Sequence, residues 1–408
     1  MKPRILLAGY NGANNTGAEA KLLVGINEIR SVVGPDACIT VPTLNEANLR
    51  RYLQEGPNLE IKPIRPSLFF VDIRRLVKQN DLIVLVEGSC YMDTWGAALL
   101  WVYLLATRYA HSMKKPCVAY SVDAGSASRF NRWLIRREAS KTDLILARTG
   151  NAAERLRKWG VKAPIEVTAD NAFAFEPDPQ DKDLLKEAWP DASQVAGLAT
   201  ENIYLWPVRI RLWDRKKYAY TWPYYFQHSK ACLEKADLLA DVLAVEADEL
   251  VEKYGKDIAL LSMEGLDTAF TNKVQQHMRH ADRTRVFSST HYNASQMTSV
   301  LRSLDLLVTS RYHAGVLSLP NQVPQTAIGH DLRIKDFYSD LDIPELFVDH
   351  EDPNRYQALS DNIENIISHY SAIKSKLQKG YQRYIEQERR NPVLLRAFLE
   401  ANYPKWLN

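Results

Sequence analysis

The sequence has few cysteines, and none of them are paired. The four in 408 residues, Cys38, Cys90, Cys117 and Cys232, lie far apart and form no CxxC pair. This spacing excludes a disulfide framework and the usual zinc sites. Free thiols are typical of a reducing compartment, so we expect a cytoplasmic protein.

Long apolar runs and an excess of one charge are also missing. The most apolar stretch, Ala97–Ala106, is about half as long as a membrane span, and the N-terminal apolar run is too short for a signal peptide. The 52 Lys and Arg residues nearly balance the 49 Asp and Glu residues, which leaves a net charge of +3. This balance gives no electrostatic reason to expect nucleic acid as the main partner.

Motifs of several cofactor sites are absent as well. The sequence contains no GxGxxG, P-loop, HExxH or GxSxG pattern, and its carboxylates lack metal-loop spacing. We therefore expect no essential metal and no nicotinamide or ATP site.

Apolar strands alternate with helical patterns along most of the chain, which is typical of βαβ units and a parallel sheet covered on both faces. A segment with two prolines and four acids, FEPDPQDKD at 175–183, interrupts the alternation and predicts a linker. We expect an α/β protein with two Rossmann-like, doubly wound domains facing a cleft, over 1–178 and 179–385. A C-terminal helix over 386–408 should pack back on the first domain. The predicted strands are 4–9, 38–41, 81–86, 117–122, 144–147 and 165–168, then 195–200, 257–262, 285–288, 306–309 and 325–328.

Ligands of such folds bind just after the strands, and four segments there attract attention. The first, GYNGANNTGAEA at 9–20, suits a turn that offers free N–H groups to an anion or a sugar. A plain capped turn would explain it equally well. The second, Glu87-Gly88-Ser89, is a small-residue turn that would let backbone approach a ligand. The third places Arg148 at a strand end, where its guanidinium could hold a carboxylate or phosphate or simply face solvent.

The fourth segment is the most specific. Arg311 and His313 follow a buried strand in the run SRYHAG, and Lys335 follows the next strand. Two cations and a group that titrates near neutrality would form a receptor for a compact, multiply charged anion. His313 could also act as a general acid.

Residues 204–226 are unusually aromatic, with nine aromatic residues, five basic ones and a single acid. Exposed aromatics beside Arg and Lys, Trp206 among them, suit stacking on sugar rings. Single-stranded nucleic acid would use the same chemistry, and a packed loop that closes the cleft is the plain structural alternative. The near-neutral net charge favours sugar.

Taken together, these segments resemble the polysaccharide pyruvyl transferase family. The family's Asn-rich loop, glycine-rich turn, first-domain Arg, Arg-Leu-His-Ala-type motif and downstream Lys all occur here, in the same order, across roughly residues 5–350. The matching segments are Asn14–Ala20, Glu87-Gly88-Ser89, Arg148-Thr149, Arg311-Tyr312-His313-Ala314 and Lys335, with Val167–Asp170 closing the first domain.

The resemblance implies a glycosyltransferase-B-like pair of domains, with phosphoenolpyruvate as donor and co-substrate and no other cofactor. The acceptor would be a sugar, nucleotide sugar or lipid-linked glycan, and a pyruvate ketal would form with release of phosphate. Donor contacts would fall to Arg148, Arg311 and Lys335, with His313 and Arg311 catalytic. The acceptor side would comprise Asn14, Asn15, Gly17, Glu19, Glu87, Gly88 and Trp206.

Departures from the family pattern leave alternatives open. The family has Asp where this chain has Ala18, and its glycine triplet reads Glu87-Gly88-Ser89 here. The chain could instead be a sugar-nucleotide-dependent glycosyltransferase, although Arg311–His330 contains no carboxylate for a nucleotide donor. It could also be a non-catalytic glycan-binding member. The basic, amphipathic stretch Arg389–Asn408 could rest on the inner face of the membrane, and homo-oligomerisation stays open.

Overall fold

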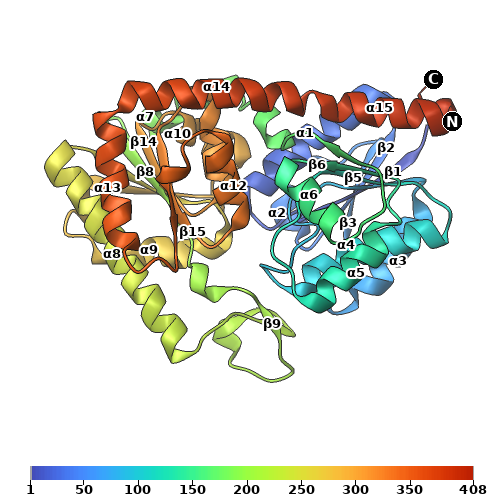
Figure 1. Ribbon diagram of the computed structural model, residues 1–408, viewed down its shortest axis with the longest axis horizontal. Coiled ribbons are helices and arrows are strands. Elements are labelled where there is room, and N and C mark those ends of the chain that lie inside the picture. Colours follow the sequence, from blue (N-terminus) through green and yellow to red (C-terminus); the bar gives the residue numbers. More distant parts are fainter. Residues whose placement is uncertain (1, 408) are drawn as a thin grey trace.

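The computed structural model describes residues 2–407, which form two α/β domains bridged by C-terminal helices (Figure 1). The first domain contains a seven-stranded, all-parallel sheet in the order β3-β2-β1-β4-β5-β6-β7. Its strands are β1 Arg4–Ala8, β2 Cys38–Thr43, β3 Leu59–Pro63, β4 Leu82–Leu85, β5 Cys117–Val122, β6 Leu144–Ala147 and β7 Ile165–Val167.

Helices cover both faces of this sheet, because β1, β4, β5 and β6 are apolar runs that must be buried on each side. Two separate apolar clusters accordingly lie on its two faces. The helices are α1 Thr16–Val33, α2 Glu46–Leu49, α3 Phe69–Gln79, α4 Ala97–Ser112, α5 Arg129–Ala139 and α6 Gly150–Lys158.

The second domain repeats the design with a six-stranded parallel sheet in the order β13-β12-β8-β14-β15-β16. Its strands are β8 Val195–Ala199, β12 Asp257–Ser262, β13 Thr284–Ser288, β14 Leu306–Thr309, β15 Gln325–Gly329 and β16 Phe347–Asp349. Its helices are α7 Leu184–Ala188, α8 Lys230–Tyr254, α9 Thr268–His277, α10 Ala294–Arg302, α11 Tyr312–Ser318, α12 Leu332–Asp340 and α13 Arg355–Ser368.

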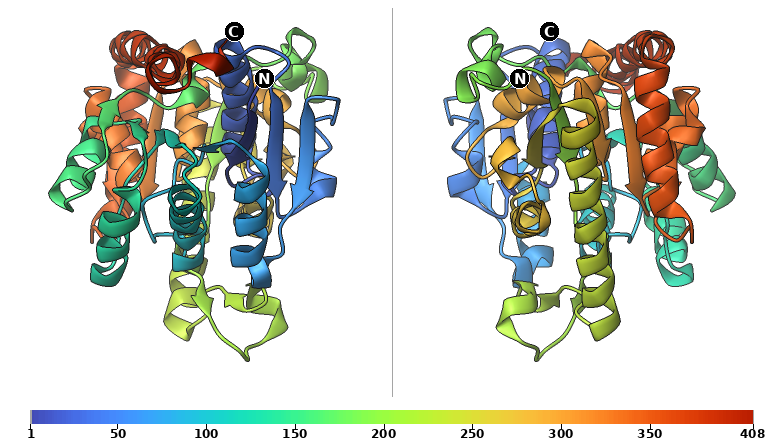
Figure 2. Two further views of the ribbon diagram at one scale, coloured as in Figure 1. Left: turned by 90° about the vertical axis from the view of Figure 1, so that its right-hand side faces the viewer. Right: turned by 90° about the vertical axis from the view of Figure 1, so that its left-hand side faces the viewer.

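Two features lie outside the sheets. The aromatic segment, residues 204–226, forms a small antiparallel sheet of β9 Arg209–Ile210, β10 Ala219–Thr221 and β11 Tyr224–Tyr225, which projects from the molecule (Figures 1 and 2). At the opposite end, α14 Tyr370–Glu388 and α15 Arg390–Asn402 cross from the second domain to the first. There Leu395 and Leu399 of α15 join the apolar cluster under α1.

The two predicted α/β domains facing a cleft are confirmed, and each predicted strand has its counterpart. The edge strands β3 and β16 and the small sheet of the aromatic segment were not predicted. No helix in residues 2–407 combines the length and apolar character of a membrane span.

Candidate functional site

A cavity opens between the domains where strands of both sheets end. It encloses about 1280 Å³, counting the solvent at its mouth, which is enough for a substrate larger than a triose phosphate. Loops after β1, β4, β8, β12, β14 and β15 contribute to its wall, as does the aromatic segment. The polar and charged residues that line it include Tyr10, Asn15, Glu87, Ser89, Glu201, Tyr220, Glu264, Arg311, His313, Asp331 and Arg333.

His313 reaches this cavity from the first turn of α11 and meets the first domain directly. Gly17, in the first turn of α1, packs so closely against the imidazole ring that a Cβ there would collide with Nδ1 and Cγ. The Nε2 atom lies 3.4 Å from Oδ2 of Asp170, without an aligned hydrogen bond. Burial lowers the pKa of His313, and the neighbouring Asp170 carboxylate opposes that shift. The imidazole is therefore clamped between the domains beside a buried carboxylate.

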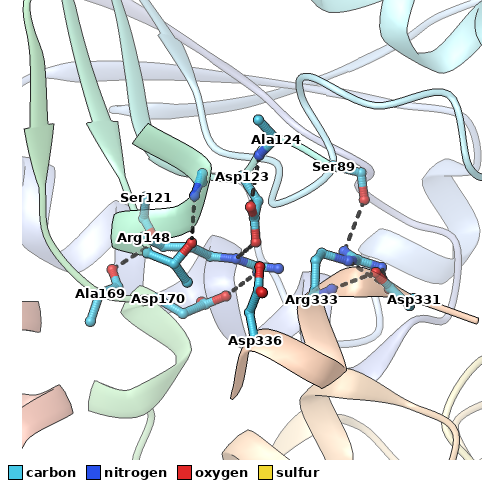
Figure 3. A network of polar contacts seen from close by, with 12 residues as sticks. Ser89, Ser121, Asp123, Ala124, Arg148, Ala169, Asp170, Asp331, Arg333 and Asp336 are labelled. Carbon is cyan, nitrogen blue, oxygen red and sulfur yellow. Dashed lines mark hydrogen bonds and ion pairs between the residues drawn. The ribbon is translucent and has the colours of Figure 1, made fainter. Parts of the chain in front are cut away.

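Arg148 lies beneath this carboxylate and is fully buried (Figure 3). Its Nε donates to Asp123 at 2.8 Å, and its Nη1 donates to Asp170. Lys21 donates to the other oxygen of Asp170 at 3.0 Å. Burial alone would raise the pKa of Asp170, but the positive charges of Lys21 and Arg148 hold this pKa well below its usual range.

The predicted donor contact at Arg148 is thus not accessible from the cavity. Its guanidinium is bound by two carboxylates, stacks 4.2 Å from the ring centre of Tyr312, and lies against Gly88. A Cβ at Gly88 would lie 2.6 Å from its Nη1. Arg148 and Gly88 therefore support the residues that line the cavity, and neither lines it.

Arg311 does line the cavity, surrounded by three carboxylates of the second domain. Its Nε donates to Asp267 at 2.9 Å, while Nη1 lies 3.1 Å from Glu201 and 3.2 Å from Glu264. Glu264 also accepts hydrogen bonds from Tyr10 and Asn15 of the first domain. This cluster, which we call the acidic trio (Glu201, Glu264 and Asp267), therefore joins both domains around a single guanidinium.

Crowding three carboxyl groups around one arginine affects their ionisation. Burial raises the pKa of Glu201 to about 7 and that of Asp267 to about 6, against the attraction of Arg311. Burial raises the pKa of Glu264 as well. Glu201 and Asp267 can therefore take up protons near neutral pH, which lowers the negative charge around Arg311.

Two basic residues of α12, Arg333 and Lys335, have different surroundings. Lys335, the predicted donor ligand, is exposed and does not line the cavity. Asp331 caps α12 by accepting from the Arg333 N–H at 2.9 Å, so the helix begins at Leu332. Residues two apart on a helix lie on nearly opposite faces, which separates Arg333 from Lys335. Arg333 faces the cavity instead, where Nη1 donates to Ser89 of the first domain at 3.2 Å (Figure 3).

The Asn-rich loop contributes to the cavity only in part. Asn15 and Gly17 line it, but Asn14 joins the domains instead. Asn14 has a positive φ of 52°, its side chain accepts from Arg51 at 2.9 Å, and its carbonyl accepts from the Ser289 hydroxyl at 2.6 Å. The neighbouring Thr16 N–H donates to a carbonyl of the second domain as well.

Glu19, another predicted acceptor contact, does not line the cavity. Its Oε2 accepts from the N–H of Ala294 at 3.1 Å and so caps α10 of the second domain. Burial raises the pKa of Glu19 to about 8. This carboxyl therefore has an interdomain structural role.

Glu87 and Trp206, two of the expected acceptor contacts, both line the cavity. Glu87 lines the cavity and accepts from the Tyr10 N–H at 3.2 Å and the Ser89 N–H at 3.1 Å. Trp206 lines it from the aromatic segment and stacks edge-on to Trp95 at 5.0 Å. The aromatic segment thus forms one wall of the cavity.

Sequence analysis missed the acidic trio and Arg333. Glu201 and Glu264 lie two residues beyond the ends of β8 and β12, and that position was the available signal. The segment Arg311–His330 contains no carboxylate, but a parallel sheet brings the ends of neighbouring strands to the same edge. Carboxylates at those other strand ends therefore face Arg311.

The two facing sheets with a cavity at their carboxyl edges define a glycosyltransferase-B-like α/β protein. Solved structures share this fold: S. aureus MnaA with UDP (TM-score 0.62, 11% identity, 94% of this chain and 95% of that one) and Anabaena HepE with UDP (TM-score 0.58, 12% identity, 98% and 100%). The chain matches the polysaccharide pyruvyl transferase family over residues 15–331 and belongs to it.

A curated relative is consistent with this family. Amylovoran biosynthesis protein AmsJ of Erwinia amylovora is 21% identical over 363 residues, which cover 84% of this chain and 80% of that protein. Family membership supports a transferase role in polysaccharide biosynthesis.

Proposed function

We propose that this protein transfers a pyruvyl group from phosphoenolpyruvate to two hydroxyls of a sugar, forming a ketal and releasing phosphate. The observation that carries the proposal is the family's Arg-x-His motif at the cavity wall. There His313 and Arg311 face the loop that carries Asn15 and Gly17 across the domain boundary.

The transfer proceeds through steps that these residues can serve. A proton adds to C3 of the enol, a sugar hydroxyl attacks C2 and loses its proton, and the C2–O bond to phosphate breaks. Loss of phosphate leaves an oxocarbenium ion at C2, which the second hydroxyl attacks. This hydroxyl loses its proton and closes the ketal, so that the donor and two hydroxyls give the ketal and phosphate. In this proposal His313 delivers or receives the proton: burial lowers its pKa, and Asp170 at 3.4 Å opposes that shift.

Binding the donor anion requires positive charge that is not already balanced. Arg311 and Arg333 line the cavity, but both are paired with carboxylates. Protonation of Glu201 and Asp267 would remove two of the three negative charges around Arg311, and an anion next to His313 would favour imidazolium. Donor binding should therefore take up protons at neutral pH.

The second candidate is a transferase that uses or accepts a nucleotide sugar. Glu201 and Glu264 on the second-domain wall favour it, because buried carboxylates there could accept hydrogen bonds from sugar or ribose hydroxyls. The fold relatives from S. aureus and Anabaena were solved with UDP. UDP-sugars therefore belong in the same binding test.

The test is calorimetric titration of phosphoenolpyruvate into the wild type, Arg333→Ala and Lys335→Ala, with UDP-sugars in parallel. We expect Arg333→Ala to weaken donor binding by about tenfold or more, the value of a charge-assisted hydrogen bond. Lys335→Ala is the matched control two residues away on α12 and should bind like the wild type, because its side chain is exposed.

Each other outcome has a definite meaning. Equal losses in both variants would contradict the assignment of Arg333 to the donor site. UDP-sugar binding that displaces phosphoenolpyruvate would favour the glycosyltransferase, whereas simultaneous binding would mark the UDP-sugar as acceptor. Binding of neither ligand would support a non-catalytic member of the family.

A further inference from the structure

The aromatic segment has a second side, which faces away from the cavity. Trp206, Val208 and Tyr220 line the cavity, but the tip of the segment projects beyond both domains (Figure 2). The tip carries large apolar side chains in solvent. Their exposed fractions are 87% for Trp213, 59% for Leu212, 58% for Trp222 and 52% for Ile210.

The first domain adds apolar side chains on the other side of the cavity mouth. Phe69, at the start of α3, and Pro66, in the turn before it, line the cavity. The next residues, Phe70 and Val71, are 45% and 46% exposed. Residues at the start of α3 and in the aromatic segment line the same cavity. Exposed apolar side chains therefore flank the mouth from both domains, and clustering of this kind marks an interaction surface.

The tip is also strongly basic. Arg209, Arg215, Lys216 and Lys217 are exposed around the tryptophans. The segment's one acid, Asp214, is already held by Arg211 at 2.5 Å and by His228 at 3.3 Å. The tip therefore presents net positive charge together with tryptophan and aliphatic side chains.

We propose that this mouth surface (Ile210, Leu212, Trp213, Lys216, Lys217, Trp222, Phe70 and Val71) docks on an anionic lipid bilayer. Tryptophan prefers the headgroup region, aliphatic side chains gain by leaving water, and lysines near an anionic leaflet are attracted to it. Single-stranded nucleic acid would use the tryptophans and cations but would leave Leu212, Ile210 and Val71 without a partner. The aliphatic content therefore favours the bilayer.

This surface lies at the opposite end of the molecule from the C-terminal stretch that sequence analysis considered for membrane contact (Figure 1). The apolar side chains Leu395 and Leu399 of that stretch are buried against the first domain. Docking at the mouth would point the cavity at the bilayer. If the proposed function holds, the acceptor sugar would then be one carried on a membrane lipid, whose chain stays in the bilayer during transfer.

The test is flotation of the full-length protein with vesicles of equal parts phosphatidylglycerol and phosphatidylcholine, and with vesicles of phosphatidylcholine alone. We expect binding to the anionic vesicles that weakens with salt. Trp213→Ser should weaken it by about tenfold or more, because a large apolar side chain no longer leaves water. Lys216→Glu with Lys217→Glu should weaken it by about thirtyfold or more, from the loss of two lysines near the surface.

The matched control reverses two exposed charges at the other end of the molecule, Arg389→Glu with Lys405→Glu, and should float like the wild type. Equal loss in the control, or no flotation of the wild type, would overturn the proposal. So would binding of a single-stranded oligonucleotide that depends on Trp213 without any binding to vesicles. The affinity of the same variants for phosphoenolpyruvate, measured by calorimetry, should equal that of the wild type. The membrane-docking proposal and the proposed function are therefore tested separately.

Discussion

Replacing Gly17 by alanine should misplace His313. The new Cβ would lie within the van der Waals radius of the imidazole ring, and no shift of a flexible chain end can relieve a clash with a ring clamped between α1 and α11. Either the ring or the helix must move. Overpacking of this kind costs about 1–3 kcal/mol of stability, and a displacement of about 1 Å at a catalytic group can cost about a hundredfold in rate.

The same helix supplies the matched control for this substitution. A Cβ at Gly25 would find its nearest neighbour, Nδ2 of Asn171, at 3.5 Å, which is ordinary contact. Gly25→Ala should therefore keep full activity and gain up to about 1 kcal/mol from helix propensity. Thermal unfolding and phosphate release with acceptor would measure both effects. Wild-type activity and stability in Gly17→Ala would refute the placement of His313 against α1.

Two pH dependences follow from the buried carboxyls. Because the pKa of Glu201 is raised to about 7, affinity for phosphoenolpyruvate should fall from about pH 6 to about pH 8 as the carboxylate forms. Calorimetry in buffers of different ionisation enthalpy would detect the proton taken up, and Glu201→Gln should flatten the profile; a flat wild-type profile would contradict this view. Glu19, with its pKa raised from 4.5 to about 8, should contribute stability at low pH that is lost as pH rises through about 8. The Glu19→Gln variant still accepts the hydrogen bond from Ala294, so its thermal stability should not fall over this pH range. The same fall in the variant as in the wild type would contradict this prediction.

The sequence was sufficient to predict the central strands but not the edges of the sheets. Runs such as Leu82–Leu85 are apolar throughout because both faces are covered, and this pattern is visible in the letters. Leu59–Pro63 alternates and is bounded by proline, and Phe347–Asp349 has only three residues. Such short edge strands depend on pairing with a neighbour already in place, which local sequence does not encode.

The site shows a similar division. The strand-end rule correctly indicated that Arg311 and His313 reach the cavity. It could not show how their charges are balanced, because Arg311 meets Glu201 and Glu264 only when distant strands pair in parallel. It also could not fix the helical phase that turns Arg333 inward and Lys335 outward, since this phase depends on where Asp331 starts the helix.

The return of α15 to the first domain has a consequence for synthesis. Leu395 and Leu399 complete an apolar cluster built mainly from residues before position 150. A chain emerging from the ribosome would therefore carry an unfinished N-terminal core, with an uncovered apolar stripe along α1, throughout translation of the entire second domain. The N-terminal domain would mature last, and chaperones would have the longest access to the half of the protein that is made first.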